Sequence, residues 1–297
     1  MIHTSEQLKT RQAYPLNLKV AMSKLRIREW YRHHHGKVYV AFSGGKDSTV
    51  LLDLVRSEYP DVPAMFADTG LEYPEIRQFV KTIPGVTWVK PKMNFREVVE
   101  RYGYPVVSKE QSQFIRQYRT AKSGKTKEIR LRGNKWGRGK ISKKWRYLID
   151  APFKISEQCC DKIKKEPIKT YEKETGEAPL LAIMASESHL RKQSYLKYGC
   201  NAFDLVRPLS NPMAFWLEPD IWGYIKKYNV PYCKLYDMGW DRTGCTFCMF
   251  GVHMEKSDLF HKNRFQRMKL SHPKLWNYCI NKLGLKQVLD TIHVDYN

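Results

Sequence analysis

The residues with the clearest chemical potential form a glycine-rich turn between an apolar run and a helical pattern. The turn is Ser43-Gly44-Gly45-Lys46-Asp47-Ser48, followed by Thr49. Backbone N–H groups in such a turn converge at the start of a helix, where the helix dipole also favours negative charge. Glycine lets the main chain approach an anion closely, and lysine adds a cation. The turn therefore predicts a site for phosphate groups.

The side chains of this turn suggest how a nucleotide would be held. Ser43 and Ser48 are candidate hydroxyl donors, Lys46 is a candidate cation for a polyphosphate, and Asp47 and Asp68 are candidate Mg²⁺ ligands. The pattern is not the P-loop of NTPases, because aspartate follows the lysine and the upstream glycine is missing. The alternative is an ordinary strand-to-helix turn capped by Ser43, which leaves the lysine unexplained.

Four of the seven cysteines fall into two pairs, Cys159-Cys160 and Cys245-x-x-Cys248. In a reducing compartment such pairs favour metal ligation over disulfides. Adjacent cysteines suit a single zinc ion poorly because their side chains diverge, whereas each iron of a 4Fe-4S cluster takes its own thiolate. A cluster is therefore the first expectation, zinc the second, and free buried thiols the third.

The chain carries a formal charge of +22, which favours phosphate-rich partners, although it also fits a solubilising surface. Within about 116–146, thirteen Lys and Arg residues accompany one acid, Glu128, and four glycines. Like charge and glycine oppose compaction, so we expect a loop or arm outside the core. Its aromatic residues suit single-stranded nucleic acid, with a solvated insertion as the alternative: Tyr118, Trp136, Trp145 and Tyr147.

The hydrophobic pattern predicts an α/β fold with a parallel twisted sheet, helices on both faces and a helical C-terminal part. Short apolar runs predict strands at residues 37–42, 62–68, 86–89 and 180–185. Helical patterns cover residues 5–31, 47–55, 74–83 and 220–228. These elements would place the glycine-rich turn between the first strand and the helix that follows it.

Size and composition fit one large domain, or a core with a smaller lobe. The chain has 297 residues, of which 42% are hydrophobic, and no apolar run reaches the roughly 18 residues of a membrane span. The first residues lack the basic and apolar regions of a secretory signal. We therefore expect a cytoplasmic protein without a membrane partner.

The glycine-rich turn resembles the pyrophosphatase loop of the adenine-nucleotide α-hydrolase group, whose members cleave ATP between the α and β phosphates. Asp68-Thr69-Gly70 and the residues after it resemble the phosphoadenosine phosphosulfate (PAPS) reductase family. The resemblance extends over about 38–248 and implies a domain at 36–250, between a helical segment at 1–35 and a helical extension at 251–297. It also implies that Thr69, Gly70, Glu187 and Arg191 line the nucleotide pocket. The alternative for Glu187 and Arg191 is a surface helix pair.

The paired cysteines resemble those of the iron-sulfur subgroup of this family, where they hold a 4Fe-4S cluster. The sequence departs from the reductases in two ways. Their Glu-Cys-Gly segment near the C-terminus is missing, and Lys46 stands in a loop from which the reductases commonly lack lysine. A lysine there would offset charge on departing pyrophosphate, which is useful when the α–β bond of ATP is broken.

These features together predict an ATP pyrophosphatase that adenylates its substrate for sulfur transfer to nucleic acid, as in tRNA thiolation or DNA phosphorothioation. ATP with Mg²⁺ is the expected cofactor, and a sulfur donor such as a cysteine desulfurase is a candidate partner. One alternative is a sulfonucleotide reductase that uses Cys279 or another thiol. A second is a nucleotide sensor without turnover. The acceptor and the oligomeric state stay open.

Overall fold

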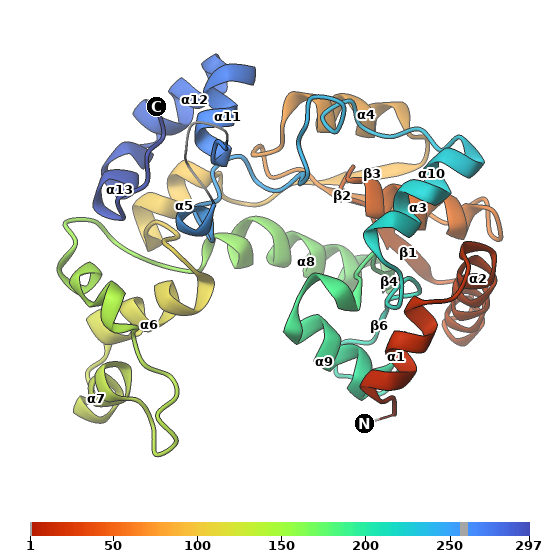
Figure 1. Ribbon diagram of the computed structural model, residues 1–297, viewed down its shortest axis with the longest axis horizontal. Helices are drawn as coiled ribbons and strands as arrows, with labels where there is room; N and C mark the ends of the chain where they lie inside the picture. The colour runs from red at the N-terminus through yellow and green to blue at the C-terminus, as the bar shows by residue number, and fades with distance from the viewer. Residues whose placement is uncertain (1, 256–260) are drawn as a thin grey trace. The chain divides into compact units, whose positions relative to one another are not determined.

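The computed structural model describes residues 2–255 and 261–297 (Figure 1). The chain folds into two compact units, each assembled from segments that are distant in sequence. The first unit comprises Met1–Asp68, Glu72–Lys90 and Ile168–Thr243, and the second comprises Thr69–Leu71, Pro91–Pro167 and Gly244–Asn297.

A six-stranded sheet organises the first unit, with strand order β3-β2-β1-β4-β6-β5. Every neighbouring pair is parallel except β5 and β6, which run antiparallel. The strands are β1 (Val38–Ala41), β2 (Ala64–Ala67), β3 (Val86–Val89), β4 (Ala178–Leu180), β5 (Asn201–Ala202) and β6 (Leu209–Ser210). A mostly parallel sheet needs helical crossovers, and it confirms the predicted fold class.

Helices cover both faces of this sheet (Figure 1). On one face, Tyr39 and Met65 pack against Tyr171 of α8 (Glu166–Thr175). On the other face lie α2 (Leu16–His33), α3 (Lys46–Arg56) and α10 (Glu218–Tyr228), which pack on one another. The unit also contains α1 (Ser5–Gln12), α4 (Pro74–Thr82), η3 (Ala185–Glu187) and α9 (His189–Tyr198).

The strand order creates a switch point between β1 and β4. The chain leaves β1 toward β2 and β3 on one side, and it returns to place β4 on the other side. In open parallel sheets, ligands bind outside the carboxyl ends of the strands at such a point. The glycine-rich turn follows β1 and η3 follows β4, so both lie at this end of the sheet.

The second unit is largely helical, as predicted for the C-terminal part. Its elements before the C-terminal segment are α5 (Phe95–Tyr102), α6 (Lys109–Thr120), α7 (Gly124–Arg132), η1 (Lys143–Asp150) and the π-helix η2 (Asp161–Lys165). The C-terminal segment adds η4 (Val252–Met254), α11 (Arg264–Ser271), α12 (Pro273–Asn277), the π-helix η5 (Tyr278–Lys282) and α13 (Leu285–Thr291). Phe265, Val288 and Leu289 are fully buried in this unit.

Two of the predicted elements need correction. The predicted strand at residues 180–185 ends at Leu180, the last residue of β4 to pair with both β1 and β6. Beyond it the chain enters η3, where the Glu187 carboxylate accepts a hydrogen bond from the Met184 amide at 2.8 Å. The predicted opening helix is two helices, because Pro15 lacks an amide proton and begins α2 as its cap.

The basic segment is not the unstructured arm that its composition predicts. It contains the C-terminal end of α6, all of α7 and the start of η1, and its Ile141 and Trp145 side chains are buried. The Arg116 guanidinium forms a bidentate ion pair with buried Glu157. Glu157 lies outside the segment, so its negative charge is not counted in the segment's composition. The segment can therefore fold, because ion pairs within the second unit neutralise part of its positive charge. Among the described residues, no helix is both long and apolar enough to cross a bilayer.

Candidate nucleotide site

The glycine-rich turn is held tightly where β1 becomes α3. Gly44 has a φ of +71°, and a Cβ there would lie 2.9 Å from Val80 Cγ2 and 3.0 Å from Ile76 Cγ2. A side chain would therefore be strained and would collide with α4. The hydroxyls of Ser48 and Thr49 both donate to the Gly45 carbonyl, at 2.9 and 3.0 Å. These bonds fix the turn before any ligand arrives.

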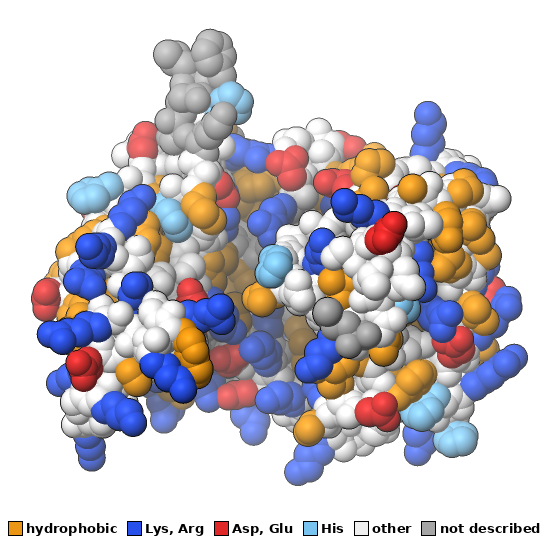
Figure 2. Space-filling view, turned by 60° about the horizontal axis from the view of Figure 1, so that its bottom comes forward, with side chains coloured by type: hydrophobic (Ala, Val, Ile, Leu, Met, Phe, Trp, Pro, Cys, Tyr) orange, Lys and Arg blue, Asp and Glu red, His pale blue; other side chains and the backbone are white. Residues whose placement is uncertain are grey.

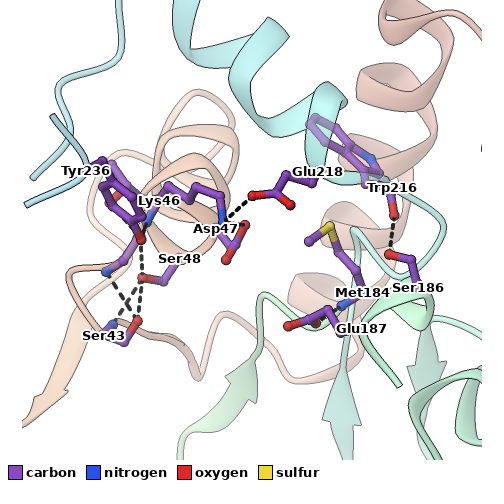
Figure 3. Close-up of polar contacts among 12 residues, drawn as sticks. Ser43, Lys46, Asp47, Ser48, Met184, Ser186, Glu187, Trp216, Glu218 and Tyr236 are labelled. Atoms are coloured by element: carbon purple, nitrogen blue, oxygen red, sulfur yellow. Dashed lines mark hydrogen bonds and ion pairs between the residues drawn. The ribbon is translucent and has the colours of Figure 1, made fainter. Parts of the chain in front are cut away.

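Hydroxyl groups accept hydrogen bonds from the turn's amides. The Ser43 amide donates to Ser48 Oγ at 3.1 Å, the Gly45 amide donates to Ser43 Oγ at 3.3 Å, and the Lys46 amide donates to the Tyr236 hydroxyl at 2.9 Å (Figure 3). These acceptors are neutral and exchangeable. The first amides of α3 have no carbonyl partner within the helix, so phosphate oxygens can replace the hydroxyls.

The Lys46 side chain is buried and lies among acidic groups. Its ammonium is 3.5 Å from Asp47 Oδ1 and 3.3 Å from Glu218 Oε1 (Figure 3). Burial alone lowers the pKa of Lys46, but the nearby Asp47, Tyr236 and Glu218 outweigh it and raise that pKa. The ammonium therefore stays charged at neutral pH, at the start of α3.

The Asp47 carboxylate carries an oxygen suited to a cation. Oδ1 is buried, and within the described residues its polar contact is the ion pair with the Lys46 ammonium at 3.5 Å, without a hydrogen bond. Burial raises the pKa of Asp47; the Lys46 ammonium opposes this, and the negative charges of Glu187 and Glu218 add to it. Glu187 lies across from the turn in Figure 3, at the end of η3. Carboxylate oxygens of this kind suit Mg²⁺.

The remaining predicted residues take other positions. Both carboxylate oxygens of Asp68 are engaged by Arg77, at 3.0 and 3.1 Å, which leaves Asp47 as the better-placed candidate for Mg²⁺. Glu187 forms an ion pair with Arg191 four residues later, and the place of both in the nucleotide pocket stays a prediction. Thr69 and Gly70 pack in the second unit, where the Leu71 amide donates to Thr69 Oγ1 at 3.2 Å.

Sequence reasoning missed two side chains at the turn, Tyr236 and Glu218. Tyr236 lies 190 positions from Lys46 along the chain, and Glu218 is an exposed residue at the start of α10. Glu218 reaches the turn because α10 packs on α3, and the Tyr236 ring packs 5.5 Å from the Trp222 ring of α10. The one available signal was the family resemblance over about 38–248, which assigned no role to the tyrosine.

Replacing Asp47 by Asn is expected to stabilise the ligand-free protein. A raised aspartate pKa means that ionisation costs folding free energy at neutral pH, and this cost disappears as the pH falls through the raised pKa toward 3.8. A gain of about 1 kcal/mol corresponds to a rise in Tm of about 2–4 °C. Thermal unfolding of Asp47→Asn at neutral and acidic pH measures it, with exposed Asp204→Asn as control. A Tm gain that persists at acidic pH would contradict this account.

All four paired cysteines lie in the second unit and are reduced. Cys159 and Cys160 immediately precede η2, and Thr246, between the other pair, donates through its hydroxyl to the Leu71 carbonyl at 3.0 Å. A hydrogen bond with Cys160, together with burial, raises the pKa of Cys159, and the charges of Cys248 and Cys245 add to the effect. Within residues 2–255 and 261–297, no three His, Cys, Asp or Glu side chains are arranged to hold a metal. The metal centre stays a prediction.

Comparison of the sequence with known proteins shows which family the chain belongs to. The model of the phosphoadenosine phosphosulfate reductase domain matches residues 37–250. An uncharacterized protein of Methanocaldococcus jannaschii is 28% identical over 86% of this chain and 43% of its own length. A second from that organism is 27% identical over 86% of this chain and 51% of its own length, so the chain spans about half of each.

Named relatives and solved structures are more distant. The adenosine 5'-phosphosulfate reductase of Shouchella clausii is 24% identical over 85% of this chain and 88% of its own length. The crystal structure of a phosphoadenylyl-sulfate reductase from Candida auris aligns with a TM-score of 0.47 and 18% identity, over 82% of this chain and 97% of that one. From the family match over residues 37–250, this chain belongs to the phosphoadenosine phosphosulfate reductase domain family.

Proposed function

We propose that this chain is an ATP-using enzyme that cleaves the bond between the α and β phosphates and transfers AMP to an acceptor, for sulfur transfer to nucleic acid. The observation that carries the proposal is the buried Lys46 ammonium, held between Asp47 and Glu218 beside the amides of the turn. A fixed cation at a phosphate site stabilises negative charge as pyrophosphate departs. A sulfonucleotide needs no such step, because it is already activated.

The roles of the turn's residues follow from their contacts. When ATP binds, the amides of Gly45 and Lys46 exchange their hydroxyl acceptors for phosphate oxygens, and the Asp47 carboxylate would hold the Mg²⁺ that accompanies the nucleotide. An acceptor oxygen attacks the α phosphorus, the bond from that phosphorus to the β-bridging oxygen breaks, and pyrophosphate leaves with the bonding electrons. The acceptor proton passes to solvent, since none of the described side chains at the turn is an evident general base.

The sulfur step uses the adenylated acceptor. Hydrosulfide attacks the acceptor carbon or phosphorus, the bond to the bridging oxygen breaks, and AMP leaves with the bonding electrons. This exchange of oxygen for sulfur needs no net oxidant or reductant when the donor is at the sulfide level. The high positive charge of the chain supports nucleic acid as the acceptor class.

A 4Fe-4S cluster is part of the proposal, with zinc as the alternative. Cys159 is buried, and the other three thiols influence its ionisation; such a group suits a cationic centre, because several neighbouring thiolates repel one another without one. Cys159, Cys160, Cys245 and Cys248 would hold the cluster. Such a cluster binds or transfers sulfur and electrons.

Anaerobically purified protein is expected to be brown, with visible absorbance that Cys248→Ser removes. The cluster would lose one of its four thiolates in that variant, whereas Cys233→Ser changes a buried cysteine of the first unit and should leave the colour unchanged. Absorbance and iron analysis of both variants provide the measurement. Colourless wild-type protein with stoichiometric zinc would favour the alternative metal.

A second candidate function is sulfonucleotide reduction, favoured by the family and by relatives named adenosine 5'-phosphosulfate reductase. The assay that separates the two incubates the protein with ATP, Mg²⁺ and tRNA, DNA or small acceptors, and measures AMP and pyrophosphate. A parallel reaction with sulfonucleotide and a thiol measures sulfite. Sulfite without pyrophosphate would replace the proposal with the reductase, and tight ATP binding without either product would indicate a sensor.

A further inference from the structure

The basic segment of residues 116–146 contains two classes of cation. Three arginines form hydrogen bonds inside the second unit. Arg116 binds the Glu157 carboxylate, and Arg119 donates to backbone carbonyls. Arg130 donates to the Gln117 side chain and to the Gly139 carbonyl. The side chains of ten others are exposed: Lys122, Lys125, Lys127, Arg132, Lys135, Arg138, Lys140, Lys143, Lys144 and Arg146. The only acid of the segment, Glu128, lies 3.6 Å from Arg132. The exposed part is therefore strongly positive.

A tightly built turn at the end of α7 carries an exposed indole ring. The Asn134 side chain accepts hydrogen bonds from the amides of Trp136 and Arg138, both at 3.0 Å, and the Asn134 amide donates to the Arg138 carbonyl at 2.8 Å. Gly133 and Gly137 have positive φ, and a Cβ at Gly133 would lie 2.7 Å from the Gly137 carbonyl carbon. The turn is therefore a defined structure whose glycines cannot be replaced without strain.

Trp136 is 69% exposed, although tryptophan is usually among the more buried residues. The Lys135 ammonium lies 4.4 Å from the centre of its ring. The ring's position is set by the turn and not by packing against a core. A flat aromatic surface surrounded by cations matches a ligand that offers both an aromatic face and negative charge.

We propose that the turn around Trp136 and the exposed cations of residues 122–146 form a binding surface for single-stranded nucleic acid, on which the indole stacks with an unpaired base. Duplexes keep their base faces stacked internally, so they would use the cations alone. Figure 2 shows a face of the molecule on which Lys and Arg side chains clearly outnumber acidic ones. This surface would bind the nucleic-acid acceptor, and the identification of its ligand as the acceptor rests on the proposed function.

The structure also corrects the aromatic residues that the sequence assigns to this surface. Trp145 is buried, with its ring 5.0 Å from the His253 ring, so it is unavailable for stacking. Tyr147 is 43% exposed, but its hydroxyl donates to the Thr291 carbonyl at 3.1 Å. Tyr118 lies half-buried in α6. Trp136 is therefore the principal stacking residue among the four that the sequence suggested.

The test is fluorescence anisotropy of labelled single-stranded DNA and RNA, and of the matching duplexes, with the full chain and no ATP. Trp136→Ala is expected to weaken single-strand binding about 10-fold and Trp136→Phe less, with duplex binding unchanged. Replacing Lys135, Arg138 and Lys140 together by Gln should weaken both and reduce the salt dependence. Tyr228→Ala is the matched control, an exposed ring 5.4 Å from the Lys227 ammonium in the first unit.

Each outcome supports or overturns the surface. An unchanged affinity in Trp136→Ala, or an equal loss in Tyr228→Ala, would remove the indole from the interface. Equal losses for single strands and duplexes would also contradict stacking. Tight binding to vesicles with anionic lipid, lost in Trp136→Ala while oligonucleotides bind weakly, would assign the surface to a membrane instead. Because ATP is absent, failure of adenylation would leave these results unaffected.

Discussion

Replacing Lys46 by Met is expected to reduce cleavage of ATP to AMP and pyrophosphate by about 10²–10³-fold. The substitution removes a fixed cation from beside the turn while keeping the length of the side chain. Without it, the carboxylates of Asp47 and Glu218 would face the polyphosphate with no compensating charge. The loss should fall mainly on kcat, because the negative charge on the β phosphate grows as the bond breaks.

The controls for this prediction separate charge from folding. Lys46→Arg keeps the charge but introduces a broader group, so we expect partial activity. Lys24→Met removes a lysine of the same unit whose ammonium lies 3.1 Å from Glu58, and it should leave turnover unchanged. Pyrophosphate release with the preferred acceptor is the measurement. Undiminished pyrophosphate release by Lys46→Met would contradict the proposal that this ammonium stabilises the departing pyrophosphate.

Local features of the site could be predicted from the sequence because a strand, a glycine turn and a helix are consecutive. Gly44 adopts the positive φ that only a glycine-rich turn readily supplies, and the following helix begins at Lys46, one residue before its predicted start. Tyr236 and Glu218 could not be predicted, since no local pattern specifies which distant segments will pack beside α3. Lys46 was recognised, but the acidic groups that raise its pKa were not.

The limits in the fold have a similar origin. The apolar run at residues 180–185 has the composition of a strand throughout, but β4 ends where its neighbours stop pairing, at Leu180. The basic segment was expected to stay unpacked because its single acidic residue cannot neutralise its many Lys and Arg side chains. Glu157 lies outside that segment, and backbone carbonyls, which composition does not count, accept hydrogen bonds from Arg119. Whether a given arginine is structural or available to a ligand therefore depends on tertiary contacts.

Arg119→Met provides the strongest test of that distinction, since we expect it to destabilise the second unit by at least about 3 kcal/mol. The guanidinium of Arg119 donates to four backbone carbonyls around the end of η1, at 2.6–2.9 Å: those of Leu148, Ile149, Ala151 and Phe153. Methionine retains much of the side-chain volume but none of the donors. All four carbonyls would lose the hydrogen bond from Arg119 at once.

Arg132→Met is the control for this prediction, because it removes an exposed arginine of the same segment. Arg132 is 81% exposed and lies 3.6 Å from a single carboxylate, so its removal should change the free energy of unfolding by less than about 0.5 kcal/mol. Arg119→Lys should recover only part of the loss, because one ammonium cannot span four carbonyls. Denaturant unfolding, with hydrogen exchange over residues 143–153, measures both effects. Equal stability of Arg119→Met and Arg132→Met would show that the two classes of cation do not differ, and that the basic segment folds without the bonds from Arg119.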